Sequence, residues 1–286
     1  MRVDAAPARS AQPYLGEMVD RSEEMVSLSA NLLAVVGYRE LLKHLVLKEL
    51  KLKYRGSVFG FLWSLVNPLL MIVVYTLAFT YILRIRTEGF VFFLLLGILA
   101  WTFFASSTMM STGAITDNAG LLKSVFFPRA ILPVATVLFN FAQYLLTAAV
   151  FLPLMLALYR VPPSGPMLLF PVFLSLQVAF TVGAGLVVST ATAFFRDVRH
   201  LLEIGLAVMF WTTPIVYELN MVPDSMRLPI LLSPMSPFIV AYQTMFYYRE
   251  WPDTMIWLIA SAYAGVTLVL GVWLFLSFEE RFAEQV

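Results

Sequence analysis

The sequence predicts an all-α integral membrane protein with six membrane-spanning helices, and its composition and its long uncharged runs carry that prediction. Of the 286 residues, 60% are hydrophobic and only 13% are charged, whereas a typical soluble domain carries about 25% charged residues. Five uncharged runs, at 57–83, 90–116, 130–159, 161–195 and 254–278, each exceed the ~20 residues that a helix needs to cross a bilayer core of ~30 Å. Backbone groups in lipid must bond internally, so these runs are expected to be helical.

An amphipathic interface helix is predicted at residues 31–56, after a polar cytoplasmic arm at residues 1–30 that lacks the apolar core of a cleavable signal peptide. The stretch 38–53 reads YRELLKHLVLKELKLK. One helical face holds Tyr38, Leu41, Leu42, Leu45 and Leu52, and off that face lie Arg39, Lys43, Lys48 and Lys51. A helix with this pattern lies in the headgroup region with its apolar face in the membrane.

The transmembrane domain is predicted to occupy residues 57–286, with its first span at about 58–83. Gly56 and Gly60 form a small-xxx-small pair that would let a second helix approach closely, and plain packing or flexibility is the alternative. Asn67 and Pro68 lie inside the span, where the proline predicts a bend. That bend is either a harmless kink or part of the wall of a pathway.

The other spans are predicted at about 90–112, 131–158, 168–194, 201–217 and 255–278. The fifth is short because Pro214 interrupts it. Between the fifth and sixth spans, the region 223–248 is apolar but holds Pro229, Pro234 and Pro237. Broken helix at membrane depth survives only inside protein or beside water. We therefore expect two short re-entrant helices there, and the alternative is a kinked seventh span.

The distribution of basic residues predicts the orientation. With six spans, 14 of the 19 Lys and Arg residues fall on the side of the N-terminus. Because basic residues accumulate on the cytoplasmic side, both termini are expected to be cytoplasmic in a bacterial inner membrane.

No residue pattern points to catalysis or to a metal site. The chain has no cysteine and no GxxxxGK[ST] motif for ATP. His44 and His200 stand near predicted cytoplasmic interfaces, and Glu203 sits at the mouth of the fifth span. A proton-driven carrier or an intramembrane enzyme would need ionisable groups inside the spans. We therefore expect no catalytic residue, no metal and no cofactor in this chain, and an energy source elsewhere.

Aromatic residues make up 15% of the chain. Most Trp and Tyr in membrane proteins form interfacial belts, which is the expectation for Trp101, Trp251 and Trp257 in particular. The alternative is that some line a channel, where flat rings with polar tips could stack on sugars.

Four segments together resemble the membrane subunit of ABC exporters for O-antigen, capsule and teichoic-acid polysaccharides. They are KYRGSVFGFLWSLVNPLLMIVVYT (53–76), NAGLLKSVFFPRAILPV (118–134), FFRDVRHLLEIGL (194–206), and PIVYE (214–218) followed by SPMSPFIVAYQTMFY (233–247). The resemblance implies six spans, gate helices between the fifth and sixth, a homodimer, and two separate ABC ATP-binding subunits. It implies that a lipid-linked polysaccharide is the substrate, and that ATP and Mg²⁺ bind to the partner subunit.

The resemblance also implies roles for particular residues. Channel-lining aromatics would be Trp63, Tyr75, Phe210, Trp211 and Tyr217. Coupling to the ATPase would involve Tyr38, Arg39, Lys43, Asp117, Lys123, Pro128 and Arg129. The gate region would include Pro229, Pro234, Pro237 and Tyr242, and Asn67 with Pro68 would bend the first span.

A further hypothesis concerns Arg55, Arg196 and Arg199, which could gather the diphosphate of a lipid carrier at the cytoplasmic entrance. Positive-inside anchoring is the alternative for these three arginines. Two other functions stay open at this point: an ABC permease for drugs or smaller lipids, and a membrane-embedded transferase acting on lipid-linked sugars.

Overall fold

The structure is a computed structural model that describes residues 37–57, 60, 62–82, 84, 89–124 and 127–282. The predicted arm at 1–30, and residues 31–36 of the predicted interface helix, lie outside the described residues. The described part is helical, with no strand. Its α-helices are α2 (Arg39–Tyr54), α3 (Leu62–Thr76), α4 (Phe90–Ser111), α5 (Ala119–Ser124), α6 (Ile131–Leu158), α7 (Phe170–Phe194), α8 (Val198–Thr212), α9 (Asp224–Leu231), α10 (Ser236–Gln243) and α11 (Thr254–Phe278).

Among the described residues, five helices are long and apolar enough to cross a membrane. They are α3 with its π-helical continuation to Ile82, α4, α6, α7 with the 3₁₀ turn before it, and α11. They occupy five of the six predicted segments. The sixth, predicted at 201–217, holds α8, which has only 15 residues and a length of about 22 Å. It ends at Thr212 because Thr213 precedes a proline and is extended.

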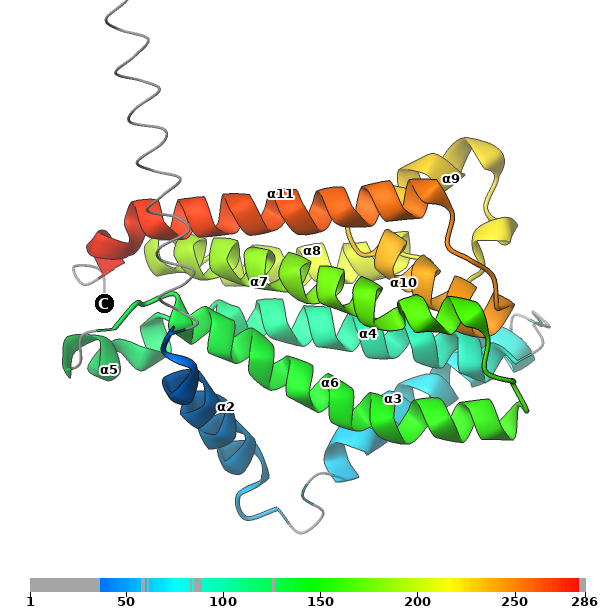
Figure 1. Cartoon of the computed structure of the whole chain (residues 1–286), viewed down its shortest axis with the longest axis horizontal. Coiled ribbons are helices and arrows are strands. Elements are labelled where there is room, and N and C mark those ends of the chain that lie inside the picture. Colours follow the sequence, from blue (N-terminus) through cyan, green and yellow to red (C-terminus); the bar gives the residue numbers. More distant parts are fainter. Residues whose placement is uncertain are drawn as a thin grey trace, which may run out of the picture. The chain divides into compact units, whose positions relative to one another are not determined.

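The helix α4 forms the centre of the bundle. It contacts α3, α6, α7, α8 and α10, and these helices surround it in Figure 1. In the most apolar part of α4, 78% of the residues are buried. In the corresponding part of Leu62–Ile82, which contains α3, only 11% are buried. Within this chain α3 is therefore a peripheral helix with a large uncovered apolar face.

The most extensive packing between two helices in the described part of the chain is that of α7 and α11. It depends on two glycines. A Cβ at Gly183 would lie 2.4 Å from the backbone carbonyl of Thr267, and a Cβ at Gly271 would lie 2.4 Å from the carbonyl oxygen of Gly183. The two backbones therefore touch, as small residues allow in membrane helices.

The predicted role of Gly56 and Gly60 in helix packing is wrong. Both have positive φ, at 74° and 48°, and they lie between α2 and α3, where no group of the described residues comes within 4 Å of the position of a Cβ. Glycine is favoured there because the left-handed region is costly for other residues.

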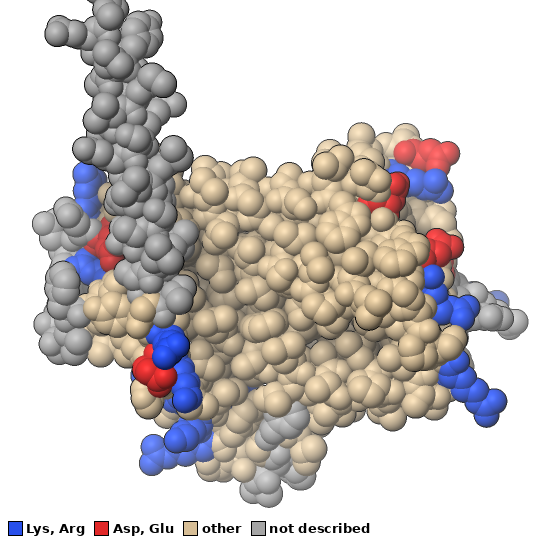
Figure 2. Space-filling view, in the orientation of Figure 1, with Lys and Arg blue, Asp and Glu red and all other residues tan. Residues whose placement is uncertain are grey.

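Charged residues gather at the two ends of the bundle. On the face shown in Figure 2, the surface between these ends is uncharged. The helix α5, the turn between α7 and α8 and the end of α11 share one end, and α9 and α10 lie at the other (Figure 1). An uncharged band between two charged ends is the surface expected of a protein that crosses a bilayer.

Candidate functional site

Two cavities meet at α3 and α4, and both are lined by Asn67, Pro68, Thr102 and Ser106. The first, called here the aromatic cavity, has a volume of about 370 Å³ and is completed by α8. The second, called the polar cavity, has a volume of about 260 Å³ and is completed by Lys53 and by α6. The predicted bend residues Asn67 and Pro68 therefore lie between the two cavities, and α3 continues through Pro68 without a break.

Phe210 is the centre of the aromatic cavity. Its ring stacks on Tyr75 from α3, with centroids 5.7 Å apart and planes 25° apart. It meets Trp101 from α4 edge-on at 5.6 Å and Trp211, its neighbour in α8, at 5.5 Å. Stacked and edge-on ring pairs add to the gain from burial, so the four rings hold α3, α4 and α8 together and give the cavity an aromatic wall in which Tyr75 and Phe210 lie nearly parallel.

Three of the five predicted channel-lining aromatics, Tyr75, Phe210 and Trp211, line the aromatic cavity. Trp63 lies in the polar cavity instead. Tyr217 follows α8, and its hydroxyl donates a hydrogen bond to the carbonyl of Trp211 at 3.1 Å. Their roles in a channel stay predictions.

The expected place of Trp101 in an interfacial belt is wrong. Trp101 stands near the middle of α4 and lines the aromatic cavity. Its position in the sequence, well inside the run 90–116, is the signal that could have shown this. Trp257 packs on Phe173 with ring centroids 4.3 Å apart, whereas Trp251 is exposed.

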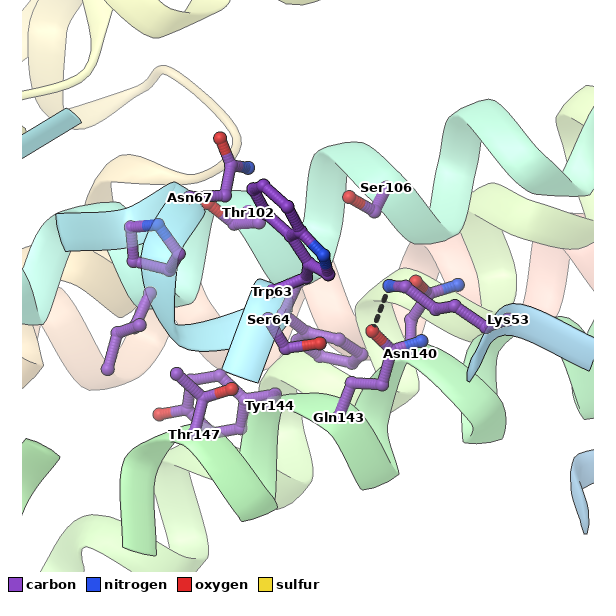
Figure 3. Close-up of a pocket in the computed structure, with 13 residues that line it drawn as sticks. Lys53, Trp63, Ser64, Asn67, Thr102, Ser106, Asn140, Gln143, Tyr144 and Thr147 are labelled. Atoms are coloured by element: carbon purple, nitrogen blue, oxygen red, sulfur yellow. Dashed lines mark hydrogen bonds between the residues drawn. The ribbon is translucent and has the colours of Figure 1, made fainter. Parts of the chain in front are cut away.

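The polar cavity is shown in Figure 3. The ammonium of Lys53, at the end of α2, donates a hydrogen bond to Oε1 of Gln143 on α6 and lies 5.8 Å from the ring of Phe139. Burial of that ammonium lowers the pKa of Lys53. Gln143 was not among the predicted site residues because it carries no charge, although an amide inside an apolar helix is itself a signal.

The predicted gate region contains two short helices with opposite environments. No residue of α9 is buried, whereas all eight residues of α10 are. Pro229 lies inside α9, Pro234 lies in the turn that follows it, and Pro237 lies in the first turn of α10. The broken segment is therefore a surface helix followed by a core helix, and its function as a gate stays a prediction.

Tyr242 anchors α10 in the core. Its hydroxyl donates a hydrogen bond to Oε1 of Gln177 on α7 at 2.7 Å, and Nε2 of Gln177 donates to the carbonyl of Ala100 on α4 at 2.9 Å. Gln243 donates to the carbonyl of Pro214 at 2.9 Å. These buried bonds tie α10 to α7, to α4 and to the segment after α8.

A second link lies outside the candidate spans. The hydroxyl of Tyr248 donates to the carboxylate of Glu218 at 2.7 Å. Partial burial and this bond raise the pKa of Tyr248, because both favour its neutral form.

The predicted coupling residues fall in two segments. Tyr38 immediately precedes α2, which begins at Arg39, and Lys43 in α2 lies 3.9 Å from Glu40 in an exposed ion pair. The second segment contains Asp117, α5 with Lys123, Pro128 and Arg129.

Arg129 contacts Glu279, the residue that directly follows α11. Its backbone N–H donates to Oε1 of Glu279 at 2.7 Å, and its guanidinium donates to the carbonyl of Glu279. The side chain of Asp117 lies against Gly113, where a Cβ would meet its Oδ2 at 2.2 Å. The loop around α5 is thus held in place by contacts within the chain.

The three arginines of the proposed entrance come from two separate segments. Arg55 follows α2, while Arg196 and Arg199 flank the start of α8. All three are exposed. Their gathering around one diphosphate stays a prediction.

Comparison with known proteins decides the family. The ABC-2 type transporter family matches residues 40–247. The chain belongs to the ABC-2 type transporter family. The O-antigen export system permease protein RfbA of Myxococcus xanthus is 36% identical over 254 residues, which cover 87% of this chain and 96% of the relative.

Two further relatives of this ABC-2 type transporter have related names. A Klebsiella pneumoniae protein that is also named O-antigen export system permease protein RfbA is 34% identical, with 74% of this chain and 82% of the relative covered. The polysialic acid transport protein KpsM of Escherichia coli is 26% identical, with 67% and 75% covered. This ABC-2 type transporter is thus a multi-pass membrane protein with a role in transport.

Proposed function

We propose that this chain is the permease subunit of an ATP-driven exporter for a lipid-linked polysaccharide of the O-antigen, capsule or teichoic-acid type. The observation that carries the proposal is its similarity, along most of its length, to a permease named for O-antigen export. The substrate crosses the inner membrane, and both termini of the chain are cytoplasmic. The helix α8 with residues 213–217 completes the sixth span.

Two copies of the chain form the channel. The helices α3 and α8 expose apolar residues that the described part of the chain leaves uncovered, among them Leu70, Val74, Ile204 and Val208. A second copy seated on these faces would bring two aromatic cavities toward a common pathway. The rings around Phe210 then offer flat surfaces to successive sugars without fixing a sequence.

Energy comes from two ABC ATP-binding subunits, which hold ATP and Mg²⁺. The helix α2 and the loop around α5 are their docking elements on the cytoplasmic side. Because Arg129 is bonded to Glu279, motion of that loop would also reach the end of α11. The helices α9 and α10 lie at the opposite end (Figure 1) and form the outer gate.

Co-purification tests this proposal. The tagged chain is expressed with its ABC ATP-binding subunit, and the detergent-solubilised complex is sized and assayed for ATPase activity. We expect a two-plus-two complex whose ATPase is stimulated by the glycolipid. As a control, replacing the P-loop lysine of the ATP-binding subunit should abolish ATPase activity and leave the complex intact.

Two outcomes contradict the proposal. A chain that purifies without the ATP-binding subunit would remove the exporter assignment. A complex stimulated by hydrophobic drugs or short lipids, but not by the glycolipid, would assign the protein to drug or lipid transport instead.

A further inference from the structure

The polar cavity borders α6, on which no predicted channel residue lies. It is bounded by α3, α4, α6 and the end of α2, and its lining is rich in amides and hydroxyls (Figure 3). The polar side chains include Asn140, Gln143, Thr147 and Ser64. Such a lining is costly beside lipid unless its polar groups find partners.

One polar group in this cavity lacks a partner. Gln143 is only 8% exposed, and its Oε1 accepts from Lys53. Its Nε2 has no hydrogen-bond partner among the described residues. The volume of about 260 Å³ is many times what a single water needs, so the cavity has room for a small polar group of a ligand.

The chemistry of the lining selects the ligand. One ammonium, from Lys53, and one free amide N–H, from Gln143, suit a phosphate oxygen, because hydrogen bonds between ionised partners are the stronger ones. Amides and hydroxyls suit sugar hydroxyls, and the indole of Trp63 offers a flat apolar face. Lys53 lies in the last turn of α2, whereas Gln143 and Thr147 lie inside a candidate span. The cavity therefore reaches from the membrane surface inward.

We propose that the polar cavity binds the sugar-phosphate headgroup of a lipid, with the phosphate on Lys53 and Gln143 and the first sugar against Asn140, Thr147 and Trp63. This inference rests on the proposed function, because it gives the exported glycolipid its first binding site on this chain. It places the phosphate beside Lys53, which lines the polar cavity and is hydrogen-bonded to Gln143, rather than at the arginines 55, 196 and 199.

The behaviour of Lys53 agrees with this assignment. Partial burial lowers the pKa of the Lys53 ammonium, which means that this position disfavours its charge. A phosphate beside the ammonium would offset that cost, since an opposite charge within a few ångström favours the charged form. A neutral sugar cannot offset the cost of the Lys53 charge, so a glycan without its phosphate should bind weakly.

Binding to the purified full-length chain is the test, measured by native mass spectrometry. The probe is a polyprenyl diphosphate that carries one hexosamine, and the comparison lipid is phosphatidylglycerol. Lys53→Gln should weaken binding of the probe tenfold or more, and Gln143→Leu should weaken it several-fold. Lys51→Gln removes the same charge from a position of the same helix that does not line the polar cavity, and this control should bind like the wild type.

Three results would overturn the inference. The first is equal affinity of Lys53→Gln and Lys51→Gln for the probe. The second is displacement of the probe by an equal concentration of phosphatidylglycerol, which would make the cavity a site for bulk anionic phospholipid. The third is that neither lipid binds, which would mean that the polar cavity holds only water. Size-exclusion chromatography shows which variants are folded. If Gln143→Leu fails to fold, the comparison of Lys53→Gln with Lys51→Gln still tests the inference.

The test also separates this inference from the proposed function, because binding is measured without ATP hydrolysis. Full export by Lys53→Gln would overturn the inference alone. Tight and lysine-dependent binding in a wild-type complex that exports nothing would overturn the proposed function alone.

Discussion

The crossing of α7 and α11 yields the most quantitative prediction. Replacing Gly183 with alanine would place a methyl group 2.4 Å from the carbonyl carbon and oxygen of Thr267 and 2.6 Å from the nitrogen of Leu268. Favourable contacts between carbon atoms lie at about 3.5–4.0 Å, so the two helices must separate by about 1 Å. The obstructing atoms belong to the backbone and cannot rotate away.

The expected loss follows from that geometry. Overpacking typically costs about 1–3 kcal/mol. At 2 kcal/mol, a shift of about 2–4 °C per kcal/mol lowers Tm by about 4–8 °C. Gly271→Ala should cost a similar amount, because its Cβ would meet the carbonyl oxygen of Gly183 at 2.4 Å. The double variant should cost less than the sum, because one separation relieves both clashes.

Thermal unfolding in detergent, followed by size-exclusion chromatography, measures this effect. Gly265→Ala is the matched control, since Gly265 lies in α11 with nothing within 4 Å of its Cβ position. Alanine favours helix there, so the control should melt at or above the wild-type temperature. Equal melting of Gly183→Ala and Gly265→Ala would refute the close contact of α7 and α11.

Three further predictions concern α10 and the aromatic cavity. Tyr242→Phe removes the bond to the glutamine on α7 and should cost about 1 kcal/mol of stability; thermal melts should show no such loss for the exposed Tyr81→Phe. Phe210→Ala should lower glycan export severalfold in an intact complex, while Phe195→Ala, at an exposed site, should leave export unchanged; equal export by both would exclude the aromatic wall from the pathway. Pro68→Leu should impair export while the complex still assembles, and unchanged export would show that the proline has no part in the channel.

The apolar helices were predictable because lipid leaves the backbone few options. Runs of about 20 uncharged residues must be helical to satisfy their own hydrogen bonds, and α4, α6, α7 and α11 lie in such runs. The short helices α9 and α10 were expected from prolines at 229, 234 and 237. The stop of α8 at Thr212 follows from Pro214, although the predicted span continued to residue 217.

The packing was less predictable, because it depends on which faces meet. Gly56 and Gly60 have the spacing of a helix-packing pair but lie in a loop with positive φ, whereas the glycines that do let helices touch, at 183 and 271, lie in different helices. Trp101 was expected at an interface by residue type, yet it packs on Phe210. Tertiary contacts between distant segments decided each of these cases.

The proposed exporter carries a glycan across a membrane, and ATP hydrolysis by a partner subunit supplies the energy. The most direct measurement reconstitutes the chain and its ABC ATP-binding subunit in liposomes, with the nucleotide sites facing outward and a lipid-linked polysaccharide supplied outside. We expect that ATP makes the glycan inaccessible to an added glycosidase, and that omission of either subunit or of ATP prevents this. Full accessibility in the complete system, with ATPase active, would contradict it.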